Sequence, residues 1–427
     1  MSEESNLMPE GWISKPLGKF IGVQGGYAFK SEDFSEVGIP IVRISNLKKN
    51  GGIDLQNAVY TKFNPLYERF EVRFGDVLIA MSGATTGKVG RYRSSNLAYL
   101  NQRVGRFYIK DKSKMDLDYV HQITSTDQFV GSVLIDAAGG AQPNISNQQI
   151  EAFNVALPPL PEQQKIATIL SSVDKVIETT RAQIDKLKDL KTAMMQELLT
   201  KGVGHTEFKD SLVGRIPASW DIIELSILVK KERPVTYGIV QTGTNIEGGI
   251  PCVRVVDLMK NDLSTDDMIR TSQEISQQYK RTILQEGDIM FALRGDIGRV
   301  RIAGSSLVGS NLTRGVALIS PSEKVISGYL LWSLRSPTVR SLILDGVNGS
   351  ALQEIPLGNL RSIQIPVPPM HEQKELAHVM DSIEFRLMKC QQKLESICRI
   401  KKSLMQDLLT GKVRVNVDNN KEEREAV

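Results

Sequence analysis

The chain carries an internal duplication. Residues 157–170 read LPPLPEQQKIATIL, and residues 367–380 read VPPMHEQKELAHVM, about 210 residues later. Further segments recur in the same order at nearly the same distance: IPIVRISNL (39–47) and IPCVRVVDL (250–258), FGDVLIAMSG (74–83) and EGDIMFALRG (286–295), MMQELLTKGV (194–203) and LMQDLLTGKV (404–413). Self-similarity at a fixed distance indicates repeated copies of one structural unit. The chain is therefore expected to fold as two similar modules in tandem.

Each copy changes character at its Pro-Pro pair. Before the pair, short β-branched runs alternate with Gly and Asn turns, which predicts strands, and helical candidates lie at 118–134 and 327–344. Pro158-Pro159 and Pro368-Pro369 require extended backbone before them, whereas the acids just beyond favour a first helical turn. Each copy is expected to be an α/β module followed by a helix.

The apolar residues beyond each Pro-Pro pair follow a heptad. They recur at alternating steps of four and three over about four to five heptads, which is typical of a coiled-coil seam. The first seam comprises Ile166, Leu170, Val173, Ile177, Thr180, Ile184, Leu187, Lys191, Met194 and Leu198. The second comprises Leu376, Met380, Ile383, Leu387, Cys390, Leu394, Ile397, Lys401, Leu404 and Leu408. The matched lysines could extend along the surface or fix the pairing register.

These helices dictate the predicted architecture. At 1.5 Å per residue each helix is about 50–60 Å long. The first helix leads into the second module, so the second helix can bury its seam against the first only by running back antiparallel. The predicted fold class is two tandem globular α/β modules separated by two long helices that form an antiparallel coiled coil, with pseudo-two-fold symmetry. The predicted segments are modules at 1–160 and 206–369, helices at 161–205 and 370–412, and a polar, disordered tail at 413–427.

Composition excludes several classes of protein. The net charge is only +4, so any nucleic-acid surface must be local. Three cysteines among 427 residues form neither a disulfide framework nor a zinc pattern. The polar N-terminus does not resemble a signal peptide, and no apolar run approaches the ~20 residues that span a bilayer. A cytoplasmic protein without membrane association is expected.

No repeated set of catalytic residues is present. SGATTGKVG (82–90) resembles a phosphate-binding loop, but only three residues separate Gly83 from Gly87, and Val89 replaces the Ser or Thr that follows the lysine in such loops. The matching segment RGDIGRV (294–300) is shorter, and the four histidines do not recur at matched places. A duplicated enzyme should duplicate its chemistry, so this chain alone is not expected to be an enzyme or to bind a metal ion.

Basic residues recur in place of catalytic ones. Residues 77–110 and 297–322 contain no acid, and Arg, Asn and Gln can contact base edges as well as phosphates. The candidate DNA contacts are Arg43, Lys88, Arg91, Arg93, Asn101, Gln102, Arg103, Arg106, Arg254, Arg294, Arg299, Arg301, Asn311 and Arg314, with Asn101 aligned to Asn311. The alternative is a solvated face whose charges pair with acids elsewhere, and Arg43 and Arg254 could equally form structural ion pairs. The glycine turns at 139–144 and 348–354 could reach a DNA groove or be plain turns.

The motifs resemble the specificity subunit of type I restriction-modification enzymes. The resemblance rests on IPxVRISNL, GDVLIAMSGATTGKVG, LNQR and the LPPLPEQQKIATIL joint, and it covers nearly the whole chain. It implies that each module is a target-recognition domain that reads one half of a bipartite site in double-stranded DNA. It also implies that the helices set the spacer and dock two methyltransferase (modification) subunits, while restriction subunits complete the enzyme.

The resemblance implies recognition without catalysis, so S-adenosylmethionine, ATP and Mg²⁺ would be bound by the partner subunits. Helix faces bearing Gln163, Gln164 and Gln373 are expected to anchor the methyltransferase. The halves differ where Ser82 is aligned with Arg294 and Gln102 with Leu312, which predicts an asymmetric, interrupted target. The competing hypothesis is a coiled-coil scaffold or adaptor whose modules bind proteins rather than DNA.

Overall fold

The computed structural model describes residues 8–48, 51–137, 143–260, 262–349 and 353–417. The chain forms two compact units, Met1–Thr180 with Lys393–Val427, and Arg181–Gln392. The two long helices, α4 (Leu160–Lys201) and α10 (Met370–Leu409), each contribute to both units. The predicted segment boundaries, which treat each helix as separate, stay a prediction. In the described part of the chain, no helix is long and apolar enough to cross a membrane.

In its described residues the first unit contains three small sheets and three short α-helices. An antiparallel sheet has the order β2-β9-β6-β7: β2 (Ile21–Gly25), β9 (Val104–Ile109), β6 (Val77–Ala80) and β7 (Val89–Arg91). A mixed sheet has the order β4-β3-β8-β5: β4 (Val59–Thr61), β3 (Ile39–Val42), β8 (Ala98–Leu100) and β5 (Glu71–Val72). The third sheet pairs β1 (Ile13–Pro16) with β10 (Asn154–Leu157). The helices are α1 (Leu117–Thr124), α2 (Asp127–Ala137) and α3 (Asn147–Ala152).

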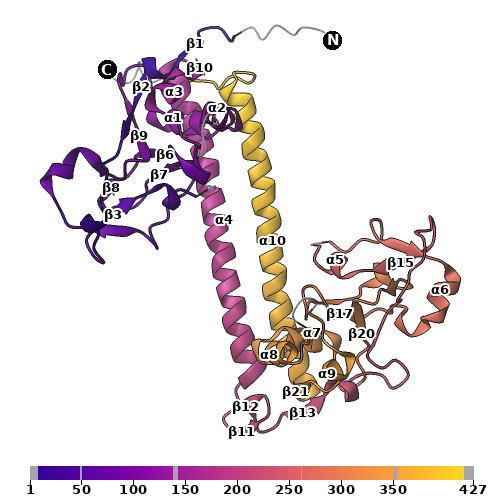
Figure 1. The fold of residues 1–427 in the computed structure, drawn as a ribbon. Coiled ribbons are helices and arrows are strands. Elements are labelled where there is room, and N and C mark those ends of the chain that lie inside the picture. The colour runs from indigo at the N-terminus through magenta and orange to yellow at the C-terminus, as the bar shows by residue number, and fades with distance from the viewer. Residues whose placement is uncertain (1–7, 49–50, 138–142, 261, 350–352, 418–427) are drawn as a thin grey trace, which may run out of the picture. The chain divides into compact units, whose positions relative to one another are not determined.

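The main core of the first unit joins its antiparallel sheet to its helices. Phe107, Tyr119 and Phe129 are almost fully buried there, together with Leu170 of α4 and Leu408 of α10. Burying each such side chain contributes about 1.5–3 kcal/mol. The short helices lie beside α4, and β3 and β8 lie farther from it (Figure 1). The module is thus anchored to the long helices through one sheet and its covering helices.

The second unit repeats this topology. Its antiparallel sheet has the order β14-β20-β17-β18: β14 (Thr236–Tyr237), β20 (Val316–Ile319), β17 (Ile289–Ala292) and β18 (Val300–Ile302). Its mixed sheet joins β16 (Ile269–Thr271), β15 (Ile250–Val253) and β19 (Asn311–Leu312), and β13 (Asp221–Glu224) pairs with β21 (Gln364–Val367). A hairpin of β11 (Phe208–Ser211) and β12 (Gly214–Pro217) is added. The helices are α5 (Val255–Leu258), α6 (Gln273–Gln278), α7 (Ser327–Arg335), α8 (Pro337–Asp345) and α9 (Leu357–Arg361). The equivalent strand orders confirm the predicted duplication.

Both predicted helical segments before the Pro-Pro pairs are helical, but each is broken in two. In the second unit the break lies at Ser336, whose side chain accepts a hydrogen bond from the Val339 N–H and caps α8. Pro337 occupies the first turn of α8. Because a residue before proline avoids the helical conformation, α7 must end where α8 begins.

The predicted seam residues of the long helices are buried or half-buried, and none of them is exposed. In the first unit the Lys401 Nζ lies 2.6 Å from an Asp174 oxygen, and in the second the Lys191 Nζ lies 2.7 Å from a Glu384 oxygen. Each seam lysine therefore forms an ion pair with a carboxylate on the other helix. In each unit, residues later in α4 contact residues earlier in α10. The two helices therefore run antiparallel, which confirms the predicted pairing.

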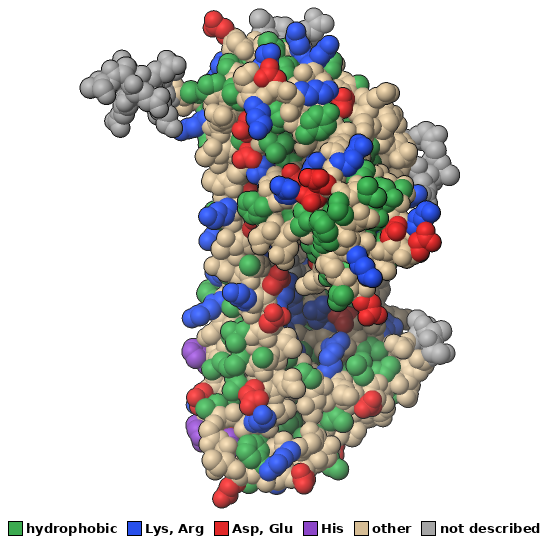
Figure 2. Space-filling view, turned by 90° about the vertical axis from the view of Figure 1, so that its left-hand side faces the viewer, with side chains coloured by type: hydrophobic (Ala, Val, Ile, Leu, Met, Phe, Trp, Pro, Cys, Tyr) green, Lys and Arg blue, Asp and Glu red, His purple; other side chains and the backbone are tan. Residues whose placement is uncertain are grey.

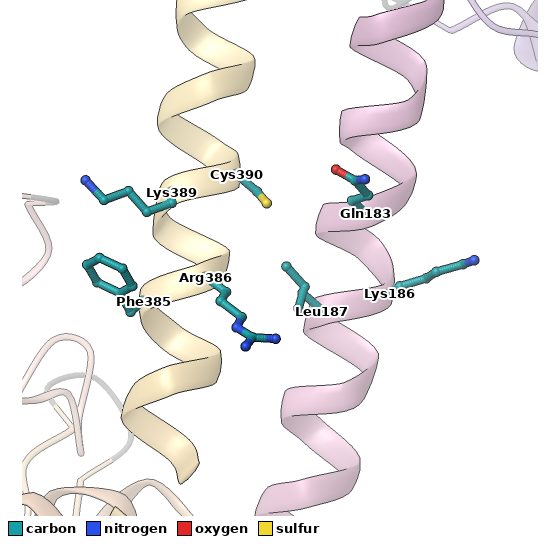
Figure 3. A pocket seen from close by; sticks show the side chains of 7 residues that line it. All are labelled: Gln183, Lys186, Leu187, Phe385, Arg386, Lys389 and Cys390. Carbon is teal, nitrogen blue, oxygen red and sulfur yellow. The ribbon is translucent and has the colours of Figure 1, made fainter. Parts of the chain in front are cut away.

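Within the second unit, the seam leaves a groove around Leu187 and Cys390. A groove of about 490 Å³ lies between the helices here, and both side chains point toward it (Figure 3). Cys390 is smaller than the leucines and isoleucines at most seam positions, so it leaves space that they would fill.

The Glu-Gln step of the first joint binds three parts of the first unit together. Glu162 is only 3% exposed and accepts a hydrogen bond of 3.2 Å from the Trp12 indole nitrogen. Its carboxylate also receives the Arg414 guanidinium at 2.7 and 2.9 Å. Arg414 belongs to the predicted tail, so the start of that tail is held in the first unit; residues 418–427 lie outside the described residues.

The second joint repeats the arrangement with a histidine in place of the arginine. Glu372 accepts a 3.0 Å hydrogen bond from the Trp220 indole nitrogen and lies 2.8 Å from the His205 Nε2. In each unit, the segment that follows one long helix is therefore tied to the glutamate that starts the other.

The glutamines of both joints are buried rather than available to a partner. Gln163 is 0% exposed; its amide nitrogen donates to the Lys114 and Pro158 carbonyls, and its oxygen accepts from the Asp116 N–H. Gln373 makes the equivalent bonds to Lys324, Pro368 and Ile326. The expectation that these two side chains anchor another subunit is wrong, because they satisfy backbone groups of their own module; Gln164 is exposed.

A Gln163→Leu substitution should destabilise the chain by about 2–4 kcal/mol, because it leaves three buried backbone groups without a partner. Urea unfolding measures this change. Gln164→Leu, on the exposed face one residue away, is the control and should change the unfolding free energy by less than about 0.5 kcal/mol. Equal effects of both substitutions would contradict the structural role of Gln163.

Candidate nucleic-acid interface

Three loops of the first unit meet at one edge. They are 81–88 after β6, the turn 101–103 between β8 and β9, and the segment 143–146 before α3. The Met81 N–H donates to the Arg103 carbonyl at 2.9 Å, and the Ile145 N–H donates to the Met81 carbonyl at 2.9 Å. Backbone hydrogen bonds therefore fix these loops, which we call the first loop edge, against one another.

The second unit has an equivalent edge. The Leu293 N–H donates to the Gly315 carbonyl at 2.9 Å, and the Ile355 N–H donates to the Leu293 carbonyl at 3.0 Å. The second loop edge consists of 293–299, 313–315 and 353–355. Parts of the glycine turns, 138–142 and 350–352, lie outside the described residues.

The backbone also fixes which residues of the two edges correspond. Gln102 N–H donates to the Tyr27 carbonyl at 2.8 Å, and Arg314 N–H donates to the Ile239 carbonyl at 2.8 Å. Gln102 is therefore equivalent to Arg314, and Asn101 to Thr313. The sequence alignments of Asn101 with Asn311 and of Gln102 with Leu312 are wrong by two residues. Because side chains in a strand alternate with a period of two, such a shift leaves the hydrophobic pattern unchanged.

Asn311 is a core residue. It is 0% exposed, accepts a 2.7 Å hydrogen bond from the Thr282 hydroxyl and donates to the Ser276 hydroxyl at 3.1 Å. It occupies the place in β19 that Tyr99 has in β8, since both pair with the parallel neighbouring strand. The prediction that Asn311 contacts DNA is wrong, because its side chain is satisfied inside the module.

Other candidates are held by acids or carbonyls of their own unit. Arg91 pairs with Asp118, Arg93 with Glu178, Arg106 with Asp76, Arg254 with Asp257 and Arg299 with Asp296. Arg301 donates to the Leu258 and Lys260 carbonyls. For these residues the alternative of internally paired charges describes the structure, and for Arg254 the structural ion pair is confirmed.

The Arg254 pair illustrates this role. Burial raises the pKa of Asp257, but hydrogen bonds from the Arg254 side chain and backbone outweigh it, and the pKa lies below its usual value. The carboxylate therefore stays charged and caps α5 through the Arg254 N–H at 2.9 Å.

The remaining candidates, apart from Arg43, lie at the loop edges. Gln102, Arg103, Arg294 and Arg314 are exposed, whereas Arg43, Lys88 and Asn101 are half-buried. The buried atoms Arg43 Nε, Ser82 Oγ and Thr85 Oγ1, also of this region, have no hydrogen-bond partner among the described residues. DNA contact by the exposed four stays a prediction.

Sequence reasoning missed two glycines behind the edges. A Cβ on Gly26 would lie 2.2 Å from the Leu100 carbonyl oxygen, and one on Gly238 would lie 2.0 Å from the Leu312 carbonyl oxygen. Only glycine lets the chain approach the edge turn so closely. The shared spacing from Gly26 to Gln102 and from Gly238 to Arg314 is the signal that could have identified them.

Within the described residues, no group of three or more His, Cys, Asp or Glu side chains could hold a metal ion. The SGATTGKVG loop forms a tight turn in which the Thr86 hydroxyl donates to the Gly83 carbonyl at 2.7 Å. On the face in Figure 2, Lys and Arg side chains are interspersed with Asp and Glu rather than gathered in one large patch. The edges therefore offer separate hydrogen-bonding and cationic groups on a rigid backbone.

Comparison with known proteins identifies the family. Residues 9–189 and 230–397 match Methylase_S, the type I restriction modification DNA specificity domain. The chain belongs to this family. It is 25% identical to the type I restriction enzyme EcoBI specificity subunit of Escherichia coli, over 88% of this chain and 79% of that protein. It is 28% identical to the putative type I restriction enzyme MjaX specificity subunit of Methanocaldococcus jannaschii, over 96% of each.

A solved structure shares the fold. The S subunit of a type I restriction-modification system from M. genitalium aligns with a TM-score of 0.62 and 14% identity, over 96% of this chain and 98% of that one. The predicted arrangement of tandem modules with long helices is thus that of a specificity subunit.

A Gly26→Ala substitution should destabilise the first unit by about 1–3 kcal/mol, because the new methyl group cannot fit without moving backbone. It should also weaken DNA binding by displacing the turn that carries Gln102 and Arg103. Thermal unfolding and a gel-shift titration measure the two effects. Gly25→Ala is the matched control, since a Cβ there has nothing within 4 Å; a loss of similar size in this control would refute the close-approach argument.

Proposed function

We propose that this chain is the DNA sequence-recognition subunit of a type I restriction-modification enzyme, and that each loop edge reads one half of a split target. The observation that carries the proposal is the pair of equivalent edges with different side chains. Gln102 in the first unit stands where Arg314 stands in the second, and Ser82 stands where Arg294 stands. The same backbone thus presents different donors, so the two half-sites should differ.

The chemistry of the exposed residues suggests what each edge prefers. Arg forms bidentate hydrogen bonds with the O6 and N7 of guanine, and Gln with the N6 and N7 of adenine. Arg294 and Arg314 would favour guanine in the second half-site, while Gln102 would favour adenine in the first. Arg103 adds a cation that suits guanine or phosphate.

Catalysis is assigned to partner subunits. We propose that the chain assembles with two methyltransferase subunits and with restriction subunits, and that S-adenosylmethionine, ATP and Mg²⁺ are bound there. A cytoplasmic location, where the DNA target lies, completes the proposal.

Exchanging the equivalent residues tests the function. Arg314→Gln should change the preferred base at one position of one half-site, with a discrimination of about 1–3 kcal/mol, and leave the other half-site intact. Gln102→Arg should do the converse. Selection from randomised duplexes, compared with the native chain, measures both changes.

Arg281→Gln, on an exposed residue outside the loop edges, is the control for the lost charge. If the native chain selects no sequence, or if its binding does not weaken with salt, the scaffold hypothesis replaces this proposal. A continuous or palindromic target would contradict the assignment of different half-sites to the two edges.

We further propose that the lengths of α4 and α10 set the spacer between the half-sites. One heptad inserted after Thr180 in α4 and one after Gln392 in α10 keeps the seam pattern and adds about 10 Å. The spacer should grow by about three base pairs, at 3.4 Å each, with unchanged half-sites. Binding to duplexes of graded spacer length measures this. Insertion into one helix alone, which misaligns the seam, is the control, and an unchanged spacer would refute the proposal.

A further inference from the structure

The second unit contains a polar cleft whose lining includes Asp296 and Arg299 of its loop edge. The cleft has a volume of about 350 Å³ and is lined by Lys191, Arg299, Arg335, Arg340, Asp296 and Glu384. Its side chains are between 24% and 44% exposed, so a ligand can reach them.

The charges in this cleft do not balance. The Glu384 carboxylate lies 2.7 Å from Lys191 and 4.0 Å from Arg335. The Asp296 carboxylate lies 2.8 Å from Arg299 and 3.9 Å from Arg340. Each carboxylate thus serves two cations, and the lining carries two more positive than negative charges.

The cations also oppose one another. Burial lowers the pKa of Arg335; the carboxylates of Glu384 and Asp381 raise it, and the guanidinium groups of Arg301 and Arg299 lower it. A bound anion would relieve this repulsion through charge-assisted hydrogen bonds, which are about twice as strong as neutral ones.

The fold does not require these cations. In the first unit, Val130 packs against the Gly87 position at 3.5 Å, where Arg340 packs against the Gly298 position at 3.5 Å. By the repeat offset, Ser125 stands at the place of Arg335. One lysine, Lys401, meets one carboxylate, Asp174, at the equivalent point of the seam. In the first unit Lys88, which follows Gly87, stands at the place of Arg299, but no charged residue replaces Arg335 or Arg340. The same module therefore closes without these two arginines, so their charge is an addition of the second unit to the shared framework.

The cleft is linked to the second loop edge by one short loop. Gly298 N–H donates to the Ala292 carbonyl at 3.0 Å, and the Ala292 N–H donates to the Arg299 carbonyl at 2.9 Å, so 293–298 form a closed loop. Arg294 projects at the edge, and Asp296 and Arg299 line the cleft. Five residues of chain span at most about 18 Å, so the cleft lies within a few nucleotides of a strand that contacts Arg294.

We propose that this cleft binds a backbone phosphate of the DNA strand that crosses the second loop edge. The inference rests on the DNA-recognition function proposed above. The phosphate would be held by Arg335 and Arg340, with Lys191 and Arg299 adding charge, and it would position the duplex while the edge reads bases. Its continuity with the edge loop favours DNA over an acidic protein segment.

The test converts the cleft to the residues of the first unit, with the double variant Arg335→Ser, Arg340→Val in the full chain. Binding to cognate and non-cognate duplexes should weaken by the same factor, on the order of tenfold, with an unchanged base preference. The slope of log affinity against log salt should fall by about one to two. The control, Lys209→Ser with Arg215→Val, removes two positive charges from the exposed hairpin β11–β12 and should leave the slope unchanged.

Several results would overturn the inference. If the variant unfolds at the same temperature as the native chain and keeps the same salt slope, the cleft is a structural ion-pair cluster and does not bind a DNA phosphate. Lost binding of the methyltransferase with intact DNA binding would assign the cleft to an acidic protein segment. Millimolar inorganic phosphate could raise the unfolding temperature of the native chain but not that of the variant. If the salt slope of DNA binding were also the same in both, the cleft would be assigned to a free anion. If the native chain bound no specific duplex, the proposed function itself would fail, and this inference with it.

Discussion

The buried carboxylate at the start of each long helix is the interaction on which the rest of the structure depends. Glu162 and Glu372 are 3% and 4% exposed, and an unpaired charge at such depth costs several kcal/mol. Each accepts a hydrogen bond from an indole N–H at the start of its module and contacts a side chain, Arg414 or His205, from the segment beyond the other long helix. Three distant parts of the chain must therefore assemble before either carboxylate is satisfied, which couples the modules to the helices.

The neighbouring glutamines extend this coupling to the module interior. Gln163 and Gln373 hydrogen-bond to the backbone just before a module helix and to the Pro-Pro segment. The Pro-Pro-x-x-Glu-Gln motif is thus a junction in which the Glu and Gln side chains have structural partners. Its recurrence reflects the geometry of the joint, whereas the loop edges, which we propose read DNA, share a backbone and differ in their side chains.

Much of the fold could be predicted because repeats and heptads are averaged over many residues. The duplication, the antiparallel seam and a helical segment in each module are all present in the structure, although each of these segments is broken in two. The exact register could not be predicted: β8 and β19 are short strands, and an apparent Asn match outweighed a two-residue difference in the intervening loops. The structural role of the glutamines could not be predicted either, because their partners are backbone groups, which every residue type provides.

The candidate site was predictable only in outline. The acid-free windows located the loop edges, but linear distance does not show that Arg91 meets Asp118 or that Arg93 meets Glu178 on α4. Such pairs join residues far apart in sequence, so charge counting within a window overestimates the cations available to DNA. Conversely, Arg335 and Arg340 lie outside both windows, although they line the polar cleft of the second unit.

The ties between each helix end and the opposite glutamate have a consequence for how such chains diversify. The Trp, Glu and Gln side chains and the Arg or His that contacts the Glu meet at the boundaries of a module. A recombination event that exchanges the whole segment between two joints would therefore transfer a complete module and keep these anchoring contacts. Cuts inside a module would instead separate residues that were selected together. The joints are thus suitable crossover points, at which a new target sequence could be acquired without changes in the packing of the core.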